Sequence, residues 1–290
     1  MFAEGVEDAM RRNQGFASPK EAAAFWAEGA AAVPTVDLTV PGGAGQTQAA
    51  RLYRGAEHAP VLLFMHGGGW TGGSIDLNER ACAALAAEGG WSVLSVSYRL
   101  APEHPFPAGL SDCCAALRWL RGGGLGFQPE RVALGGASAG GNLALACALS
   151  EGGPLAVLLL FYPVCGDDFD TQSYYEYAEG FGLTRARMQE LFSLYDPEEM
   201  YRNDPRLVPL KGDLRGMPRC EIIAAELDVL ADDSRRLASR LTEAGVPNTL
   251  HIEPGVTHGF INRGRLIPAA DICLSRAAKA LRHIIEPEMT

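Results

Sequence analysis

The 290-residue chain lacks the marks of several large protein classes. It has no basic excess: 35 Asp and Glu outweigh 25 Lys and Arg, and a net charge of −10 disfavours nucleic acid and anionic membranes as partners. Its longest apolar run, Leu155 to Cys165, contains Pro163 and is too short to cross a bilayer. The first residues are acidic and lack an apolar stretch, so we expect no secretory signal, no membrane insertion and a cytoplasmic location.

Patterns typical of metal sites and disulfide frameworks are also missing. The chain has Cys 7 and His 6, yet no Cys-x-x-Cys pair and no ligand spacing such as His-x-x-x-His. We therefore expect buried, reduced thiols and no metal. With 47% hydrophobic and 21% charged residues, the composition is that of an ordinary globular enzyme.

Strand-like and helical segments alternate along most of the chain. Such alternation predicts an α/β fold with a mostly parallel central sheet and helices on both of its faces. The first two strands flank the turn Gly42–Gly45 and are expected to form a hairpin. The expected strands are Thr35–Val40, Ala49–Tyr53, Val61–Met65, Trp91–Tyr98, Arg131–Gly135, Ala156–Tyr162, Glu221–Leu227 and Thr249–Ile252. The expected helices are Leu77–Glu88, Ala108–Leu120, Gly141–Ser150, Asp232–Ala244 and Pro268–Ile285.

The alternation stops between Cys165 and about Leu214, where aromatic residues lie among acids. This segment is too apolar for a disordered linker, so we expect one or two helices that form a lid. The chain then divides into an N-terminal cap segment with the first strand (1–45), a first part of the core (46–164), a cap insertion (165–214) and a second part of the core (215–290). The aromatic residues expected to roof the site are Phe169, Tyr174, Tyr175, Tyr177, Phe181 and Phe192, with Phe16, Phe25 and Trp26 beside them.

Ligands of such sheets bind beyond the carboxyl ends of the strands, and the first reactive motif there surrounds Ser138. Gly136-Ala137-Ser138-Ala139-Gly140 joins a predicted strand to a predicted helix. Small residues allow a tight, strained turn with the serine at its tip, and a helix N-terminus favours developing negative charge. The motif predicts a nucleophile. A phosphate-binding loop is the alternative, but no Gly-Lys-Ser/Thr follows.

The second motif, His66-Gly67-Gly68-Gly69-Trp70, directly follows the predicted strand Val61–Met65. Successive glycines let backbone N–H groups approach a ligand oxygen, which is what stabilising a tetrahedral oxyanion requires. His66 precedes Ser138, whereas hydrolases with a serine on a strand-to-helix turn run in the order serine, acid, histidine. We therefore expect His66 to anchor the loop rather than to act as the base.

The acid and the base of a triad must then follow Ser138. Asp228 closes a predicted strand, and His258 follows the next one, so the two fall in the required order on different strand-end loops. The remaining candidates are expected in other places: Glu226 within its strand, Asp232 and Asp233 at the start of the next helix, His251 inside a strand and His283 on a helix surface.

These motifs resemble the hormone-sensitive-lipase-like, or bacterial family IV, esterases of the α/β-hydrolase superfamily, in the family's order from about residue 60 to 285. The resemblance implies an α/β-hydrolase fold with a helical cap, and oxyanion N–H groups from Gly68, Gly69 and Ala139. The motifs that carry it are His66-Gly67-Gly68-Gly69-Trp70, Tyr98-Arg99-Leu100-Ala101-Pro102-Glu103-His104-Pro105-Phe106-Pro107-Ala108, Ser138-Ala139-Gly140-Gly141-Asn142-Leu143-Ala144, Tyr162-Pro163, Asp228 with Asp232-Asp233, and Pro254-Gly255 with His258-Gly259-Phe260.

Two positions depart from the family's pattern. Ala137 stands before the serine, where the family usually has Asp or Thr, and Val229 stands where it has a rigid proline after the acid. We expect altered local bracing rather than lost chemistry. In the proline-rich loop we expect Arg99 and Glu103 to pair with each other.

The sequence thus predicts a serine carboxylesterase that hydrolyses short-chain acyl esters through Ser138, Asp228, His258 and a covalent acyl-enzyme, without a cofactor. Its expected partner is a small-molecule ester, and a homodimer is left open. One alternative is an arylformamidase-type amidase on the same fold. Another is a non-catalytic small-molecule receptor, against which the complete triad argues.

Overall fold

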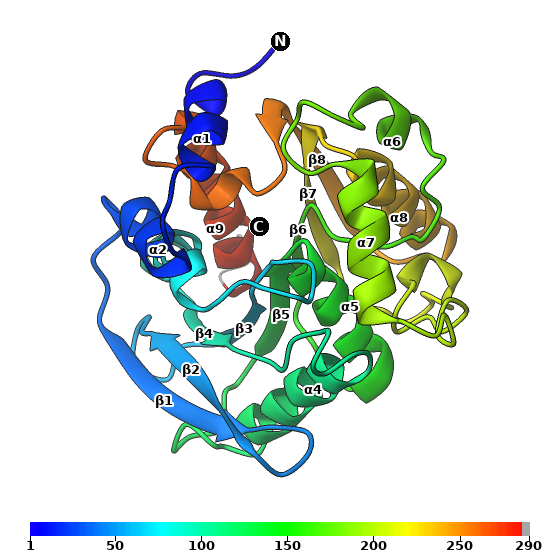
Figure 1. The fold of residues 1–290 in the computed structure, drawn as a ribbon. Helices are drawn as coiled ribbons and strands as arrows, with labels where there is room; N and C mark the ends of the chain where they lie inside the picture. The colour runs from blue at the N-terminus through cyan, green and yellow to red at the C-terminus, as the bar shows by residue number, and fades with distance from the viewer. Residues whose placement is uncertain (286–290) are drawn as a thin grey trace.

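A single sheet organises the fold in the computed structural model, which describes residues 1–285; residues 286–290, the end of the segment 215–290, lie outside the described residues. Its order is β1-β2-β4-β3-β5-β6-β7-β8 (Figure 1). β1 and β2 pair antiparallel, β2 also runs antiparallel to β4, and all other pairs are parallel. The strands are β1 (Thr35–Pro41), β2 (Thr47–Tyr53), β3 (Val61–Met65), β4 (Ser92–Val96), β5 (Val132–Ala137), β6 (Leu158–Phe161), β7 (Cys220–Leu227) and β8 (Asn248–Thr257).

This is the mostly parallel sheet that the alternation predicts, including the hairpin of β1 and β2. β8 is the main difference, since it runs to Thr257, five positions beyond the expected Ile252, and so ends directly before His258. The helices are α1 (Val6–Asn13), α2 (Pro19–Ala27), α3 (Glu79–Gly89), α4 (Ala108–Arg121), α5 (Ala139–Glu151), α6 (Gln172–Glu176), α7 (Arg185–Tyr195), α8 (Ala231–Glu243) and α9 (Pro268–Ile285), with 3-10 turns η1 (Asp76–Asn78), η2 (Pro209–Lys211) and η3 (Phe260–Asn262).

Helices cover both faces of the sheet, and β3 shows how the sequence divides between them. Successive side chains of a strand point to opposite faces. Leu62 and Phe64 accordingly pack in one core with α3 and α9, whereas Leu63 and Met65 pack in the other with α4 and α5. Because both faces are buried, the central strands read as continuous apolar runs rather than as alternating ones.

Two segments approach the carboxyl ends of the strands from opposite faces of the sheet (Figure 1). The N-terminal helices α1 and α2 belong to the core on the α3 and α9 side, where Val6 and Trp26 are buried. The segment 165–214, called the insertion below, holds α6, α7 and η2 and packs into the core on the α5 side. The insertion contains helices and no strand, as expected, whereas α1 and α2 were not predicted.

The cysteine side chains lie in the interior of the protein. All seven cysteines are buried and unpaired. Within residues 1–285, no helix is both long and apolar enough to cross a membrane.

Candidate active site

Ser138 stands at a sharp turn between β5 and α5. Its backbone has φ 57° and ψ −121°, a left-handed conformation that is strained for a residue with a side chain. The flanking glycines make the turn possible, because a Cβ on Gly136 would lie 2.4 Å from the backbone of Gly140, and one on Gly140 would lie 2.1 Å from the Met65 carbonyl oxygen. The turn therefore needs the small residues that the sequence supplies.

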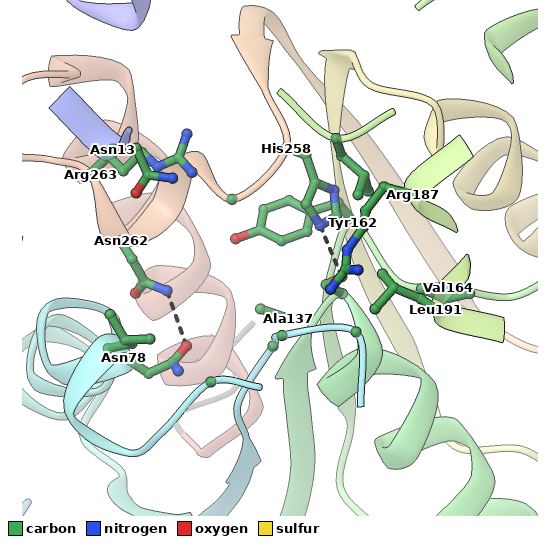
Figure 2. A pocket seen from close by; sticks show the side chains of 18 of the residues that line it. Asn13, Asn78, Ala137, Tyr162, Val164, Arg187, Leu191, His258, Asn262 and Arg263 are labelled. Carbon is green, nitrogen blue, oxygen red and sulfur yellow. Dashed lines mark hydrogen bonds between the residues drawn. The ribbon is translucent and has the colours of Figure 1, made fainter. Parts of the chain in front are cut away.

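His258 links this serine to a buried carboxylate. Its Nε2 lies 2.9 Å from Ser138 Oγ, and its Nδ1 lies 2.6 Å from Asp228 Oδ2. Figure 2 shows the His258 imidazole beside Tyr162, and a dashed line marks the hydrogen bond of its ring. Asp228 follows β7, is 1% exposed, and accepts a further hydrogen bond from the Leu230 N–H. The structure thus brings together the three residues that the sequence order selects.

The glycine loop after β3 lies directly beside the serine. A Cβ on Gly67 would lie 3.5 Å from Ser138 Cβ. Gly68 and Gly69 have φ values of 131° and 62°, and a Cβ on Gly69 would meet Leu191 at 2.5 Å. Within residues 1–285 the N–H groups of Gly68 and Gly69 have no backbone acceptor. As the first residue of α5, Ala139 also has an N–H without a partner in the helix.

His66 packs beneath the glycine loop, in the core, and its ring makes no hydrogen bond with Ser138 within residues 1–285. It is 1% exposed, its ring stacks on Tyr98 at 4.3 Å, and the Tyr98 hydroxyl donates to the His66 carbonyl oxygen at 2.8 Å. Burial lowers the pKa of the His66 imidazole to about 4, so the ring is neutral near pH 7. These contacts agree with the expected anchoring role. His251 lies in β8 and His283 on the exposed face of α9, as expected.

The remaining acids hold loops around the site, partly in ways that the sequence did not predict. The Glu226 carboxylate accepts the Gly255 N–H at 2.7 Å and so braces the chain before His258. Asp232 accepts the Ser173 N–H, and Asp233 accepts the N–H groups of Cys165 and Gly166. The two aspartates therefore attach the insertion to α8 rather than simply capping that helix. Burial raises the pKa of the Asp233 carboxyl to about 7.

The expected pair of Arg99 and Glu103 is wrong. Arg99 instead binds the fully buried carboxylate of Asp112 on α4, through Nε and Nη2 at 2.9 Å each. The same carboxylate accepts the Gly43 N–H from the hairpin turn. Glu103 is nearer to Arg99 in the sequence, which is why it is the expected partner. Folding buries Asp112 instead, and a buried carboxylate needs a cation such as the Arg99 guanidinium beside it.

A cavity of about 380 Å³ opens above Ser138, between the N-terminal helices and the insertion. One wall is mainly apolar and is formed by Val164, Leu183, Met188 and Leu191, with Arg187 on the same side. The opposite wall is polar and consists of Asn13 from the end of α1, Asn78, Asn262 and Arg263, with Trp26 beside them. Figure 2 shows Asn13 and Arg263 on one side and Arg187 and Leu191 on the other.

The expected aromatic roof is therefore wrong in its residues. Of the aromatic side chains in the insertion, none lines this cavity within the described part of the chain. Two of them anchor α7 instead: Tyr195 stacks on Trp70 at 4.5 Å, and Phe192 meets Trp70 edge-on at 5.2 Å. Phe169 and Tyr174 extend the same cluster. Aromatic rings gain most from full burial, and Tyr174, Phe192 and Tyr195 are accordingly buried under the cap, while aliphatic groups face the cavity.

Sequence reasoning missed the polar wall. Arg263 is five positions after His258 on the same strand-end loop, and that placement is the one signal that could have singled it out. Asn13 comes from a helix that was not predicted, so nothing local in the sequence connects it with the site. Among residues 1–285, no group of three or more His, Cys, Asp or Glu side chains is placed to hold a metal ion.

Comparisons with known proteins agree with this architecture. A family model described as the alpha/beta hydrolase fold matches residues 62–262. The carboxylesterase NlhH of Mycobacterium tuberculosis is 37% identical over 239 residues, which cover 79% of this chain and 75% of the relative. The ethyl acetate hydrolase of Pseudomonas putida is 35% identical over 260 residues, covering 85% of this chain and 81% of that enzyme.

The solved structures give the same result over nearly the whole chain. An ester hydrolase from the metagenome of Lake Arreo superposes with a TM-score of 0.88 at 30% identity, and the match covers 99% of this chain and 100% of the other. This similarity extends to the N-terminal segment, where the sequence motifs offer no match.

Proposed function

The chain belongs to the hormone-sensitive-lipase-like, or bacterial family IV, group of α/β-hydrolases and is a carboxylic ester hydrolase; within that activity, we propose that it cleaves short-chain acyl esters with Ser138, His258 and Asp228 as its catalytic triad. The observation that carries the proposal is the position of one imidazole between a strained serine and a buried carboxylate, at 2.9 and 2.6 Å. The relatives are named for esters, which favours an ester over an amide substrate.

Acylation follows from this geometry. His258 Nε2 takes the proton of Ser138 Oγ while that oxygen attacks the ester carbonyl carbon. Asp228 keeps the Nδ1 proton directed toward itself, which leaves Nε2 free to accept, and it stabilises the imidazolium that forms. The carbonyl oxygen becomes an oxyanion that the N–H groups of Gly68, Gly69 and Ala139 are free to receive.

The acyl-enzyme then breaks down by the same groups. The imidazolium of His258 returns its proton to the leaving alkoxide, and the alcohol departs. A water molecule takes the place of the alcohol, gives a proton to His258 Nε2 and attacks the acyl carbon. Collapse of the second oxyanion releases the carboxylic acid and restores the Ser138 hydroxyl. Every step uses side chains and backbone N–H groups of this chain, and water.

The preference for short acyl groups rests on the size and boundary of the cavity. A volume of about 380 Å³ accommodates a small ester, and Met188 and Leu191 bound its apolar side. Each buried methylene is favourable by about 0.8 kcal/mol only while room remains, and overfilling is destabilising. The relative named ethyl acetate hydrolase has a name consistent with a short acyl ester. In this proposal residues 1–45 and 165–214 act as the two parts of a cap.

Ser138→Ala tests the proposed nucleophile. We expect the variant to fold normally and to lose kcat for a soluble acyl ester by several orders of magnitude, because no other group forms the acyl-enzyme. An organophosphonate probe should label the wild type and leave Ser138→Ala unlabelled.

Ser150→Ala is the matched control, because Ser150 lies in the last turn of the same helix and, within residues 1–285, its hydroxyl donates only to the Ala146 carbonyl oxygen. It should keep full activity and full labelling. Retention of more than about a tenth of wild-type kcat by Ser138→Ala exceeds what the oxyanion N–H groups and binding alone supply, and would exclude Ser138 as the nucleophile.

A further inference from the structure

The cavity above Ser138 is cationic in a protein that is acidic overall. The chain carries a net charge of −10, yet Arg187 and Arg263 line the cavity, and no Asp or Glu is found among its described lining residues. Asp228 lies behind His258 and is covered by it. A cavity lined by one sign of charge concentrates the field and favours a ligand of the opposite sign.

The two arginines differ in their partners. Arg187 pairs with Glu190 on the same helix at 2.6 Å, and its side chain is 46% exposed, so its charge is both offset and screened. Arg263 is half-buried, and within residues 1–285 its guanidinium makes no ion pair and no hydrogen bond. Burial lowers the pKa of Arg263, although a guanidinium stays protonated at neutral pH.

A partly buried cation without a carboxylate partner is unfavourable for a folded protein. Most other arginines of this chain avoid that situation: Arg99, Arg202 and Arg276, for example, each reach a well-buried carboxylate. Residues that break such a rule tend to mark functional sites, where a bound group supplies the missing partner. Arg263 therefore lacks a partner where a ligand has access.

Arg263 also lies within reach of the reacting groups. Its guanidinium rests against Gly259, where a Cβ would meet one of its nitrogens at 3.4 Å. Its positive charge acts on the Tyr162 hydroxyl, lowering a pKa that burial raises. The Tyr162 ring lies 4.7 Å from the His258 ring, so a single side chain separates the cation from the base. Asn13 and Arg263 also line a second, adjoining cavity of about 310 Å³.

We propose that Arg263 is a specificity-determining residue that binds a carboxylate carried by the ester substrate, which makes the substrate class anionic esters. The inference rests on the proposed function, because it concerns a substrate held at Ser138. A guanidinium offers two parallel N–H donors that match a carboxylate, and Asn13 beside it adds an amide donor. The carboxylate can belong to the acyl part, as in a dicarboxylate half-ester, or to the alcohol part, as in an acylated hydroxy acid.

The kinetic test compares each anionic ester with its neutral amide. One arm compares monoethyl glutarate with the ethyl ester of glutaric acid monoamide, in which an amide replaces the free carboxylate. The other arm compares 4-acetoxybutyrate with 4-acetoxybutyramide in the same way. We expect the wild type to prefer the carboxylate in one arm, which identifies the part of the substrate that Arg263 reads. In that arm Arg263→Met should lower the carboxylate-to-amide ratio of kcat/KM by tenfold to about a hundredfold, which is the contribution of a charge-assisted hydrogen bond.

Three variants sharpen this result. Arg263→Lys should keep part of the preference, because it retains the charge without the paired donors. Arg54→Met is the matched control, since Arg54 is exposed beside Gly55 and Ser92, where β4 begins, away from the cavity. It should leave the ratio unchanged. The inference is overturned if wild type and Arg263→Met have the same carboxylate-to-amide ratio of kcat/KM in both arms, or if only Arg187→Met loses the preference. Hydrolysis of the neutral esters would still support the proposed function in either case.

A binding measurement decides the question without any turnover. Glutarate should bind the Ser138→Ala protein in isothermal titration calorimetry and bind the Ser138→Ala, Arg263→Met protein at least tenfold more weakly. Equal binding to both proteins, or none to the first, contradicts the inference whatever the kinetics show. Arg263→Met should also keep or raise Tm, because it removes an unpaired cation. A marked fall in Tm would instead assign Arg263 a structural role.

Discussion

The catalytic edge of the sheet and the wall of the cavity are held in different ways. Ser138, Asp228 and His258 each come directly after a strand, so the main-chain hydrogen bonds of β5, β7 and β8 fix their positions. The wall of the cavity, meaning its apolar and polar sides together, has no such framework of strands. It consists of side chains from α1, α7 and η3, which reach the cavity from opposite faces of the sheet.

Because of this difference, we expect the strand-end residues to control the rate of the reaction and the cavity wall to control the choice of substrate. The groups proposed to react stand directly after hydrogen-bonded strands, where the geometry depends on local backbone and on glycines such as Gly136 and Gly140. The groups that meet the rest of a substrate depend on how distant helices pack. Changes at the catalytic edge should therefore act on kcat by orders of magnitude, and changes in the wall should act on the choice of substrate by smaller factors.

The largest effect predicted for the comparison is that of Asp228→Asn. Asparagine keeps the shape of the side chain, but its amide can satisfy His258 Nδ1 in the wrong tautomer and cannot stabilise the imidazolium. We expect kcat to fall by about 10³- to 10⁴-fold with little change in KM. Steady-state kinetics on a soluble acyl ester measures both constants.

Asp213→Asn serves as the control for that substitution, because Asp213 pairs with Arg215 at the surface and its side chain is 59% exposed. It should leave kcat unchanged. A loss of less than tenfold in Asp228→Asn, with the chemical step limiting the rate, would show that the buried carboxylate is not the orienting acid.

The catalytic edge could be predicted from the sequence because its information is local. The elbow around Ser138 and the glycines after His66 stand in unbroken short motifs, and each motif directly follows an apolar run that reads as a strand. Chain order, together with a position directly after a predicted strand, then selected Asp228 and His258 from several alternatives. The structure adds the distances between these residues.

The wall could not be predicted because its residues meet only through distant packing. The aromatic content of the insertion suggested a roof, but Trp70 from the glycine loop takes Phe192 and Tyr195 as partners, and the cavity receives Met188 and Leu191. Neighbours in sequence misled in the same way at Arg99, whose partner lies on α4. Of the two helices in residues 1–45, α2 shows no strong apolar period, and α1 is only eight residues long, so tertiary contacts decide whether both form.

The second prediction concerns acid stability at the catalytic edge. The pKa of His66 is lowered from 6.5 to about 4 by burial, so below pH 6.5 the unfolded chain binds a proton that the folded protein does not. The free energy of unfolding that His66 contributes is therefore complete above pH 6.5 and is lost as pH falls toward 4. We expect a loss of about 2 kcal/mol between pH 7.5 and pH 5, at about 1.4 kcal/mol for each pH unit below 6.5.

Urea unfolding of wild type and His66→Gln at the two pH values isolates this effect. The variant loses the ring stacking on Tyr98 at every pH, but it cannot titrate at position 66, so its stability deficit should shrink at pH 5. Asp233, whose pKa burial raises to about 7, titrates over the same range with the opposite sign. It does so in both proteins and cancels in their difference. A deficit that is the same at both pH values would show that His66 is protonated in the fold.

The smallest effect belongs to the wall, and Met188→Ala measures it. Met188 is 1% exposed and faces the cavity from α7, so its truncation lengthens the apolar side without touching the triad. With p-nitrophenyl esters from acetyl to decanoyl, we expect the wild type to prefer chains up to hexanoyl. Each added methylene that finds room is worth about 0.8 kcal/mol, or roughly fourfold. Met188→Ala should therefore raise the octanoyl-to-butyryl ratio of kcat/KM by about tenfold.

Gln189→Ala changes the neighbouring exposed residue of α7 and should leave the chain-length profile unchanged. Faster turnover of an emulsified long-chain triglyceride than of soluble butyrate esters by the wild type would refute the short-chain preference itself. An unaltered profile in Met188→Ala would place the acyl chain on the other side of the cavity, against Trp26 and α1. In that case the apolar wall would contact the alcohol part of the ester, and the polar wall would contact the acyl part, the reverse of the arrangement proposed above.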